Sequence, residues 1–126
     1  MTTVGIGVDI VDVARFDLAL TRHPALAARL FTADERRDAG ERPERLAARF
    51  AAKEAVLKSL RVGLGATSWH SIEIHRDEDG APSVLLHGTA ADLAAHRGVT
   101  SMKVSMSHTD TMAAAFVVAS AQRDRA

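Results

Sequence analysis

The sequence predicts an α+β fold, a single compact domain in which a mostly antiparallel sheet is packed by a long central helix. Three observations predict this class. Residues 4–11 alternate with the period of two that is typical of a strand. Residues 42–60 follow the helical period of 3.6 residues. Beyond residue 69, short alternating segments are separated by turn residues, which favours antiparallel pairing.

The first strand, VGIGVDIVDV, has two unlike faces. One face is branched and apolar, and it consists of Val4, Ile6, Val8 and Ile10. The other face is nearly bare, and it consists of Gly5, Gly7, Asp9 and Val11. Glycines beside an acid mark a place where another backbone or a ligand approaches closely. The alternative is an edge strand whose polar face meets water, with Asp9 solvated.

Two helix starts follow this strand. Asp12 is a candidate cap for a helix that carries Arg15 and Phe16. Arg22 lies seven residues after Arg15 and therefore on the same side of that helix. Further on, the pair Thr32 and Glu35 forms the capping-box pattern of a short helix, which is a structural role.

The long helix over residues 42–60 has Pro43 in its first turn and Gly63 after its end. Its apolar stripe consists of Leu46, Phe50, Leu57 and Leu60, and alanines fill most other positions, so neighbouring backbone can pack closely. Lys53 falls inside that stripe, Glu54 lies at its border, and Lys58 is one turn beyond Glu54. In the simplest interpretation Lys53 extends its ammonium to water and Glu54 pairs with Lys58 on the surface.

The rest of the chain supplies the other strands. We expect a strand over 69–76, a turn at Asp79–Gly80, a strand over 83–87 and a helix over 89–96 that ends at Gly98. Two strands close the domain. In the first, His108 shares a face with Val104 and Met106, where a hydrogen-bonded structural histidine is the ordinary interpretation. The last, over 112–119, is almost wholly apolar and is predicted to be buried and central.

Composition limits the classes of function. With 126 residues, 47% of them hydrophobic, the chain is expected to form one soluble domain over 1–121 with a frayed polar tail over 122–126. Sixteen basic and sixteen acidic residues give no net charge, which argues against nucleic acid as a partner. Neither a secretory leader nor a membrane span is predicted. The absence of cysteine fits a cytoplasmic protein, and the histidines lack the spacing of a zinc site.

Four motifs, in order, carry a family resemblance: GIGVDIVDVARF, FTADER, RFAAKEAVLKSL and KVSMSHTDTMAAAFVVA. With these motifs at this spacing, the chain from Val4 to Val118 resembles the holo-acyl-carrier-protein synthases, the small bacterial type of 4′-phosphopantetheinyl transferase. The resemblance implies that Asp9 and Glu54 bind a catalytic Mg²⁺ ion. That ion prefers octahedral oxygen coordination and usually takes one or two carboxylates, with water and substrate phosphate completing its shell.

The same resemblance implies roles for four further residues. Lys53 and Lys58 match two lysines of the family helix, and Lys58 is expected near the phosphates of coenzyme A. Arg49 is expected to contact a phosphate or to anchor the helix. His108 is expected beside the nucleotide end of coenzyme A.

The implied reaction moves 4′-phosphopantetheine from coenzyme A to a serine of an apo acyl carrier protein and releases adenosine 3′,5′-bisphosphate. It requires charge neutralisation, in-line positioning and proton transfer. Lys58 is the candidate for stabilising or protonating the leaving phosphate, and Glu54 is the candidate for helping to deprotonate the serine. Asp9 completes the catalytic set as a metal ligand. Direct transfer is expected, because no cysteine or serine triad suggests a covalent intermediate.

The resemblance also implies partners. Arg15 matches a carrier-binding position, Arg22 lies on the same side, and an arginine face suits an acidic carrier protein of either fatty-acid or polyketide type. The alternative is that these arginines form the solvated side of a surface helix. The family is usually a homotrimer with active sites between subunits, so His108 or Arg15 is expected to serve a site completed by the Asp9 and Glu54 of a neighbouring subunit.

One segment departs from the family pattern. Where many relatives have an A-x-G-T-G-type turn, this chain has SLRVG, so Arg61 and Val62 change a loop that borders the coenzyme in relatives. Two other functions remain open at this point. The chain could be a non-catalytic trimeric binding module, or a small Mg²⁺-dependent pyrophosphohydrolase that uses the same two carboxylates.

Overall fold

The computed structural model describes residues 1–122, and it contains five strands and five α-helices within that range. The strands are β1 (Thr2–Asp12), β2 (Ile72–Arg76), β3 (Pro82–Leu86), β4 (Ser101–His108) and β5 (Met112–Ala121). The helices are α1 (Val13–Arg22), α2 (Leu26–Leu30), α3 (Ala33–Ala39), α4 (Pro43–Ser59) and α5 (Gly88–His96), with one 3₁₀ turn, η1 (Trp69–Ser71). None of the described helices is long and apolar enough to cross a membrane.

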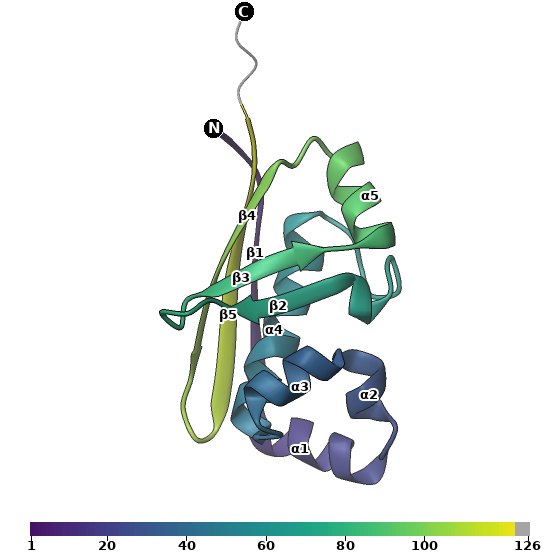
Figure 1. Ribbon diagram of the computed structural model, residues 1–126, viewed down its shortest axis with the longest axis vertical. Coiled ribbons are helices and arrows are strands. Elements are labelled where there is room, and N and C mark those ends of the chain that lie inside the picture. The colour runs from purple at the N-terminus through teal and green to yellow at the C-terminus, as the bar shows by residue number, and fades with distance from the viewer. Residues whose placement is uncertain (123–126) are drawn as a thin grey trace, which may run out of the picture.

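Every strand pairing in the described residues is antiparallel. Strands β1, β5 and β4 form one sheet in that order, and β2 and β3 form a separate two-stranded ribbon (Figure 1). The last strand, β5, is central as predicted, but only one of its faces is buried. Ala113, Ala115, Val117 and Ala119 are at most 2% exposed, whereas Met112 and Phe116 on the other face are 39% and 45% exposed. The predicted α+β class with a mostly antiparallel sheet is therefore confirmed.

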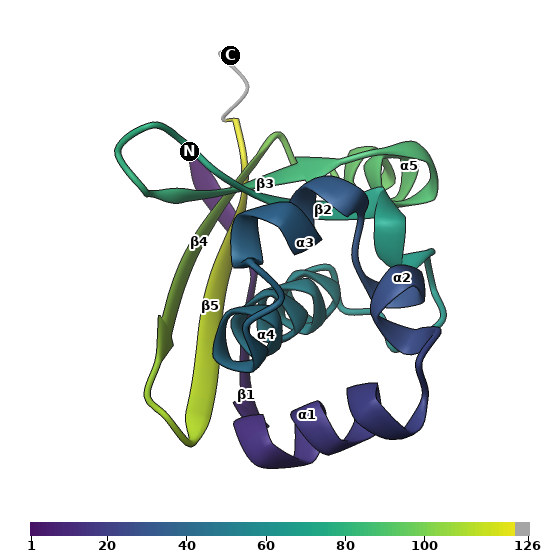
Figure 2. The ribbon, with the colours of Figure 1, turned by 60° about the horizontal axis from the view of Figure 1, so that its bottom comes forward.

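Helix α4 lies at the centre of the molecule. In Figure 2 the three-stranded sheet covers one side of α4, while α1, α2, α3 and the β2–β3 ribbon surround the others. The alanines of this helix explain how it fits there, because Ala47, Ala48, Ala51, Ala52 and Ala55 are all buried and add little bulk. The resulting core joins α4 to β5 and β2, with Val56, Leu60, Ile72 and Ile74 almost fully enclosed.

The two glycines of β1 admit the backbone of α4. A Cβ atom placed on Gly7 would lie 2.0 Å from the carbonyl oxygen of Ala55, and one placed on Gly5 would lie 1.9 Å from that of Ser59. The prediction that these glycines mark a close backbone approach is thus confirmed. The bare face of β1 is consequently the buried one, and the branched side chains point outward, with Ile6, Val8 and Ile10 all more than half exposed.

Local signals were mostly correct. Asp12 caps α1 by accepting from the Arg15 amide at 2.9 Å, and Thr32 and Glu35 form the complete capping box of α3. The strand expected over 69–76 begins only at Ile72, because the Ser71 amide bonds to the Ser68 carbonyl and closes the turn of η1. Helix α2 has no side-chain cap and was not predicted. Gln122 bonds to Thr100, and residues 123–126 of the predicted tail lie outside the described residues.

Candidate active site

Asp9 and Glu54 lie side by side where β1 meets α4. Asp9 projects from the glycine-bearing face of β1, and Glu54 projects from the border of the apolar stripe of α4. Partial burial raises the pKa of Glu54, and the negative charge of Asp9 raises it further, although Lys58 opposes both effects. Two carboxylates that repel each other in a partly desolvated place form a site that gains stability from a cation.

Lys58 completes this group from one turn further along α4. Its Nζ atom donates to Asp9 Oδ1 at 3.1 Å and to the backbone carbonyl of Val8 at 2.9 Å. Its ion pair is therefore with Asp9 across the seam between β1 and α4, and not the surface pair with Glu54 that helical spacing suggested. The ammonium stays accessible, with half of the side chain exposed.

A surface hollow of about 310 Å³ opens beside the two acids. Its lining consists of Asp9, Ile10, Val11, Asp12, Arg15, Phe16 and Glu54. No cluster of three or more histidine, cysteine, aspartate or glutamate side chains suited to a metal ion occurs in residues 1–122. The donor set is thus two carboxylates, which fits Mg²⁺, an ion that takes few protein ligands and keeps positions for water and phosphate.

Lys53 has a different environment from its neighbour Glu54. Its side chain is fully buried, and Nζ donates to Glu35 Oε1 at 2.7 Å and to the Trp69 carbonyl at 2.9 Å. Burial lowers the pKa of Lys53, and Glu35 opposes that shift. The expectation of a coenzyme contact through Lys53 is corrected here, because the ammonium is enclosed and its acceptors belong to the protein. The alternative of an ammonium extended to water is also wrong.

Arg49 is likewise in the interior, with 1% of its surface exposed. Nη1 donates to the Arg45 carbonyl at 3.2 Å, while Nε and Nη2 have no hydrogen-bond partner in the described part of the chain. Burial lowers the pKa of Arg49, and the charge of Arg76 adds to this effect. Of the two roles expected for Arg49, its burial favours a structural role within α4 over contact with a phosphate.

A model of the 4′-phosphopantetheinyl transferase superfamily matches residues 5–117. The chain belongs to this superfamily. It is 51% identical over 119 residues to the holo-[acyl-carrier-protein] synthase of Frankia casuarinae, which covers 94% of this chain and 98% of the relative.

Solved structures of the superfamily share the fold. The synthase of Neisseria meningitidis superposes with a TM-score of 0.85 at 32% identity and covers 94% of this chain and 99% of its own. The Helicobacter pylori synthase, solved in complex with coenzyme A, gives a TM-score of 0.83 at 32% identity and covers 91% of this chain and 99% of its own.

Two predicted residues of this phosphopantetheinyl transferase fold lie apart from the two acids. His108 is exposed at the end of β4, on the same face of the sheet as Asp9, but β5 lies between their strands. A single subunit therefore does not bring His108 to Asp9. Arg22 lies at the far end of α1 from Arg15, beside a second hollow of about 550 Å³ that Arg29 also lines.

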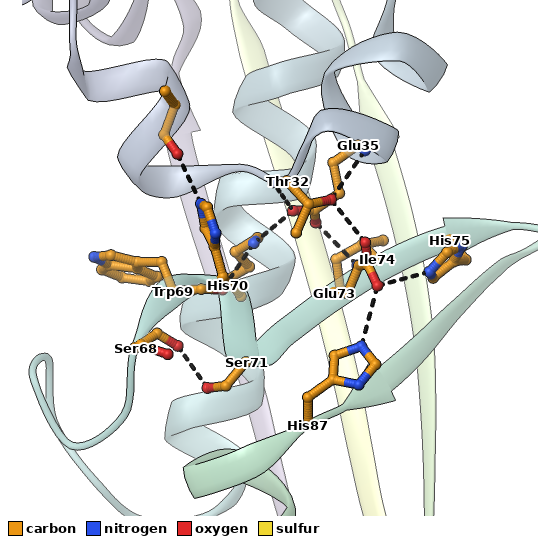
Figure 3. A network of polar contacts seen from close by, with 12 residues as sticks. Thr32, Glu35, Ser68, Trp69, His70, Ser71, Glu73, Ile74, His75 and His87 are labelled. Atoms are coloured by element: carbon orange, nitrogen blue, oxygen red, sulfur yellow. Dashed lines mark hydrogen bonds and ion pairs between the residues drawn. The ribbon is translucent and has the colours of Figure 1, made fainter.

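A polar network on the other side of α4 was not predicted from the sequence. Glu35, in addition to capping α3, accepts from Lys53 and from the Ile74 amide, and so joins α3, α4 and β2 (Figure 3). The one available signal was Lys53 itself, because a lysine inside an apolar stripe requires a buried partner. Spacing along the chain could not identify that partner, since Glu35 lies eighteen residues away.

A second carboxylate extends this network. Glu73 accepts from the Thr32 hydroxyl at 2.7 Å, and Nε2 atoms of His75 and His87 lie 3.0 and 3.1 Å from Glu73 Oε1 (Figure 3). Burial alone would raise the pKa of Glu73, but these polar partners outweigh it and lower the pKa to about 2. Glu73 is thus held as a carboxylate that ties α3 to the β2–β3 ribbon.

Proposed function

We propose that this chain transfers 4′-phosphopantetheine from coenzyme A to a serine of an apo acyl carrier protein, with Mg²⁺ held by Asp9 and Glu54. The observation that carries the proposal is the pairing of these two acids beside the accessible Lys58, in a chain of the 4′-phosphopantetheinyl transferase superfamily. The relatives that are named holo-[acyl-carrier-protein] synthases, and the related structure in complex with coenzyme A, support the substrates.

Each residue then has a distinct task. Bound Mg²⁺ supplies charge neutralisation and orientation of the pyrophosphate. Lys58 stabilises the leaving phosphate, since its ammonium is accessible and can turn from Asp9 toward a stronger anion. Glu54, whose pKa is raised, is suited to accept the proton of the attacking serine. The serine oxygen forms the new bond to phosphorus as the bond to adenosine 3′,5′-bisphosphate breaks.

The carrier protein is proposed to dock along α1. Arg15 lines the hollow that contains Asp9 and Glu54, and both Arg15 and Arg22 are exposed. An acidic carrier is therefore drawn to the face from which its serine can reach the two acids. For the coenzyme, we propose contacts from Lys58 and from His108, while Arg49 and Lys53 support α4 from the interior.

The outer face of the sheet supports a homotrimer in which the sites lie between subunits. Ile6, Val8 and Ile10 on β1 adjoin Phe116 on β5, and all four side chains are 45 to 64% exposed. A contiguous apolar face of this kind marks a protein interface. For the sites to lie between subunits, the packing would also have to reach the opposite face of the sheet, on which Asp9 and His108 lie. Light scattering of the wild type and of a Val8→Lys variant tests this, and a fully active wild-type monomer would contradict it.

The decisive experiment uses an apo carrier protein, coenzyme A and Mg²⁺. The carrier should gain the mass of phosphopantetheine, and EDTA should abolish the gain. Cleavage of coenzyme A without labelling of the carrier would instead indicate a pyrophosphohydrolase, and binding without any reaction would indicate a binding module. The proposed place in the cell is the cytoplasm, in fatty acid biosynthesis, and a preference for fatty-acid over polyketide carriers in the same assay supports that assignment.

A further inference from the structure

Helix α2 is short and has few means of holding its own position. It spans five residues, and no side chain caps its N-terminus. Leu30 near its end and the following Phe31 are buried and anchor it to the core. A helix of this length has little stability by itself. The orientation of its outer residues therefore depends on contacts with other elements.

One such contact is a hydrogen bond from His70 in η1. Its Nε2 atom lies 2.7 Å from the carbonyl oxygen of Ala28 in α2 (Figure 3). Because a carbonyl oxygen only accepts, Nε2 carries the hydrogen and donates it. In a longer helix this carbonyl would accept from the amide of Thr32, but that amide donates to Glu35 Oε1 in the capping box of α3. His70 thus supplies the donor that the end of α2 lacks.

His70 extends from a firmly held segment. The carbonyl of its neighbour Trp69 accepts from the buried Lys53 Nζ at 2.9 Å. The Trp69 ring also packs on Phe50, with 5.3 Å between the ring centroids. Both Lys53 and Phe50 belong to α4, so η1 is fixed to the central helix. The bond from His70 therefore links α2 to α4.

Stability alone does not explain this bond. His70 and Ala28 are both exposed, so water can replace either partner, and the net contribution to folding is small. What the bond fixes is the position of the next residue, Arg29. Where α1 leads into α2, a hollow of about 550 Å³ is lined by Arg22, His23, Pro24, Ala25, Leu26 and Arg29.

This hollow combines positive charge with apolar surface. Arg22 and Arg29 are exposed, and within residues 1–122 neither guanidinium forms an ion pair. Pro24 and Leu26 supply apolar surface between them. Such a surface is complementary to an acidic protein partner, and it continues the one that begins at Arg15 beside the two acids.

We propose that His70 is a positioning residue for carrier binding, because it holds α2 so that Arg29, together with Arg22, contacts acidic side chains of the carrier protein. This inference rests on the proposed function, in which the carrier docks along α1. It extends that docking surface onto α2. It also gives His70, which bonds only to backbone, an effect on the affinity for one substrate and not for the other.

Calorimetric titration of the whole protein with an apo acyl carrier protein, followed by labelling kinetics at varied carrier and coenzyme A, tests this. His70→Ala should weaken carrier binding and raise the KM for the carrier about 3- to 10-fold, the loss typical of one hydrogen bond. Both kcat and the KM for coenzyme A should stay unchanged. His70→Gln should recover the wild-type values, because its amide nitrogen can donate to the same carbonyl.

A double-mutant cycle connects His70 to Arg29. Arg29→Ala should also weaken carrier binding, and adding His70→Ala to it should cause no further loss, since His70 acts through Arg29. His96→Ala is the matched control, because His96 is an exposed histidine at the end of α5. It should change neither the affinity for the carrier nor the melting temperature.

Three results would overturn the inference. They are a His70→Ala variant with wild-type affinity for the carrier, equal rises in the KM for both substrates, and failure of His70→Gln to restore binding. The titration separates this inference from the proposed function. A wild type that binds the carrier with the expected dependence on His70, and does not label it, would contradict the proposed function alone.

Discussion

The two sides of α4 use the same residue types for opposite purposes. On the interior side, Lys53 is enclosed and its partner Glu35 accepts from Lys53, Thr32 and Ile74. On the seam side, Glu54 lies beside another acid and Lys58 remains half exposed. Lys53 and Glu54 are adjacent in sequence, so the difference comes from what surrounds each of them. Buried charged side chains whose hydrogen-bond partners are complete stabilise the fold. Partly exposed charged side chains without a full set of partners are available to bind a ligand or to take part in a reaction.

The largest expected effect is on the free energy of unfolding, and it comes from the buried pair of Lys53 and Glu35. Lys53→Met leaves the buried Glu35 carboxylate without its cation, and removing one member of a buried pair typically costs about 3–5 kcal/mol. Urea unfolding should therefore show a loss of this size. The double variant Lys53→Met with Glu35→Leu is the control, and it should recover much of the stability. Equal stability of the single and double variants would mean that the ion pair does not set the loss.

On the seam side, Asp9→Asn and Glu54→Gln should reduce carrier labelling by on the order of 10² to 10³-fold, because a metal ligand contributes several kcal/mol to transition-state stabilisation. Both variants should stay folded, since neither acid is part of the core. Mass measurement of the carrier over time, with circular dichroism of each variant, checks both statements. Full activity of both variants would show that Asp9 and Glu54 do not bind the metal ion.

A third test concerns the contact that joins β1 to α4. Gly7→Ala places a methyl group against the Ala55 carbonyl, and overpacking of this kind costs about 1–3 kcal/mol. Transfer should fall together with stability, because Asp9 and Glu54 depend on that contact. Gly63→Ala is the matched control, since a Cβ atom there meets nothing within 4 Å. If both variants were equally stable, the close approach would not be needed.

The pH dependence of stability separates the two sides further. Glu73 has a folded pKa of about 2, below its ordinary value of 4.5, so it contributes stability that is present above pH 4.5 and is lost as the pH falls toward 2. Thermal melts between these values should show the wild type losing more stability than Glu73→Gln. If the melting temperatures of the two proteins changed in parallel with pH, the polar network would not keep the Glu73 side chain ionised.

The smallest expected effect is on the stability of the fold, and it comes from Glu54 at the contact between β1 and α4. The folded pKa of Glu54 is raised, so its ionisation destabilises the fold as the pH rises through that pKa. Without Mg²⁺ at neutral pH, Glu54→Gln should melt slightly above the wild type. Added Mg²⁺ should raise the melting temperature of the wild type but not that of Glu54→Gln, and an equal rise in both proteins would contradict the shared site.

Much of the site was predictable because its signals are local. Gly5 and Gly7 beside Asp9, and a glutamate at the border of an apolar helix face, are visible as departures from regular patterns. The partners of Lys53 and Arg49 were not predictable in this way. Their roles depend on α3 and β2 closing over α4. Helical spacing assigned the Lys53 ammonium to water, and the family resemblance assigned it to the coenzyme.

The orientation of β1 illustrates the same limit. Its alternation predicted a strand with two unlike faces, and the glycines predicted a close approach. Which face was covered depends on α4, whose alanines allow it to lie directly on the glycines. Similarly, Arg61 is visible in the sequence as a departure from a turn pattern, but its left-handed backbone conformation, with φ of +61°, requires the structure.

The pairing of β1 with β5 also determines when the site can form. Asp9 lies opposite Ala115, so the strand that carries one of the two acids is held by residues more than a hundred positions later. During synthesis the N-terminal strand has no partner until residues 112–121 have left the ribosome. A nascent chain that already contains Asp9, Glu54 and Lys58 therefore lacks the strand that holds Asp9 in place, and competence to bind the coenzyme should appear only after residues 112–121 have emerged.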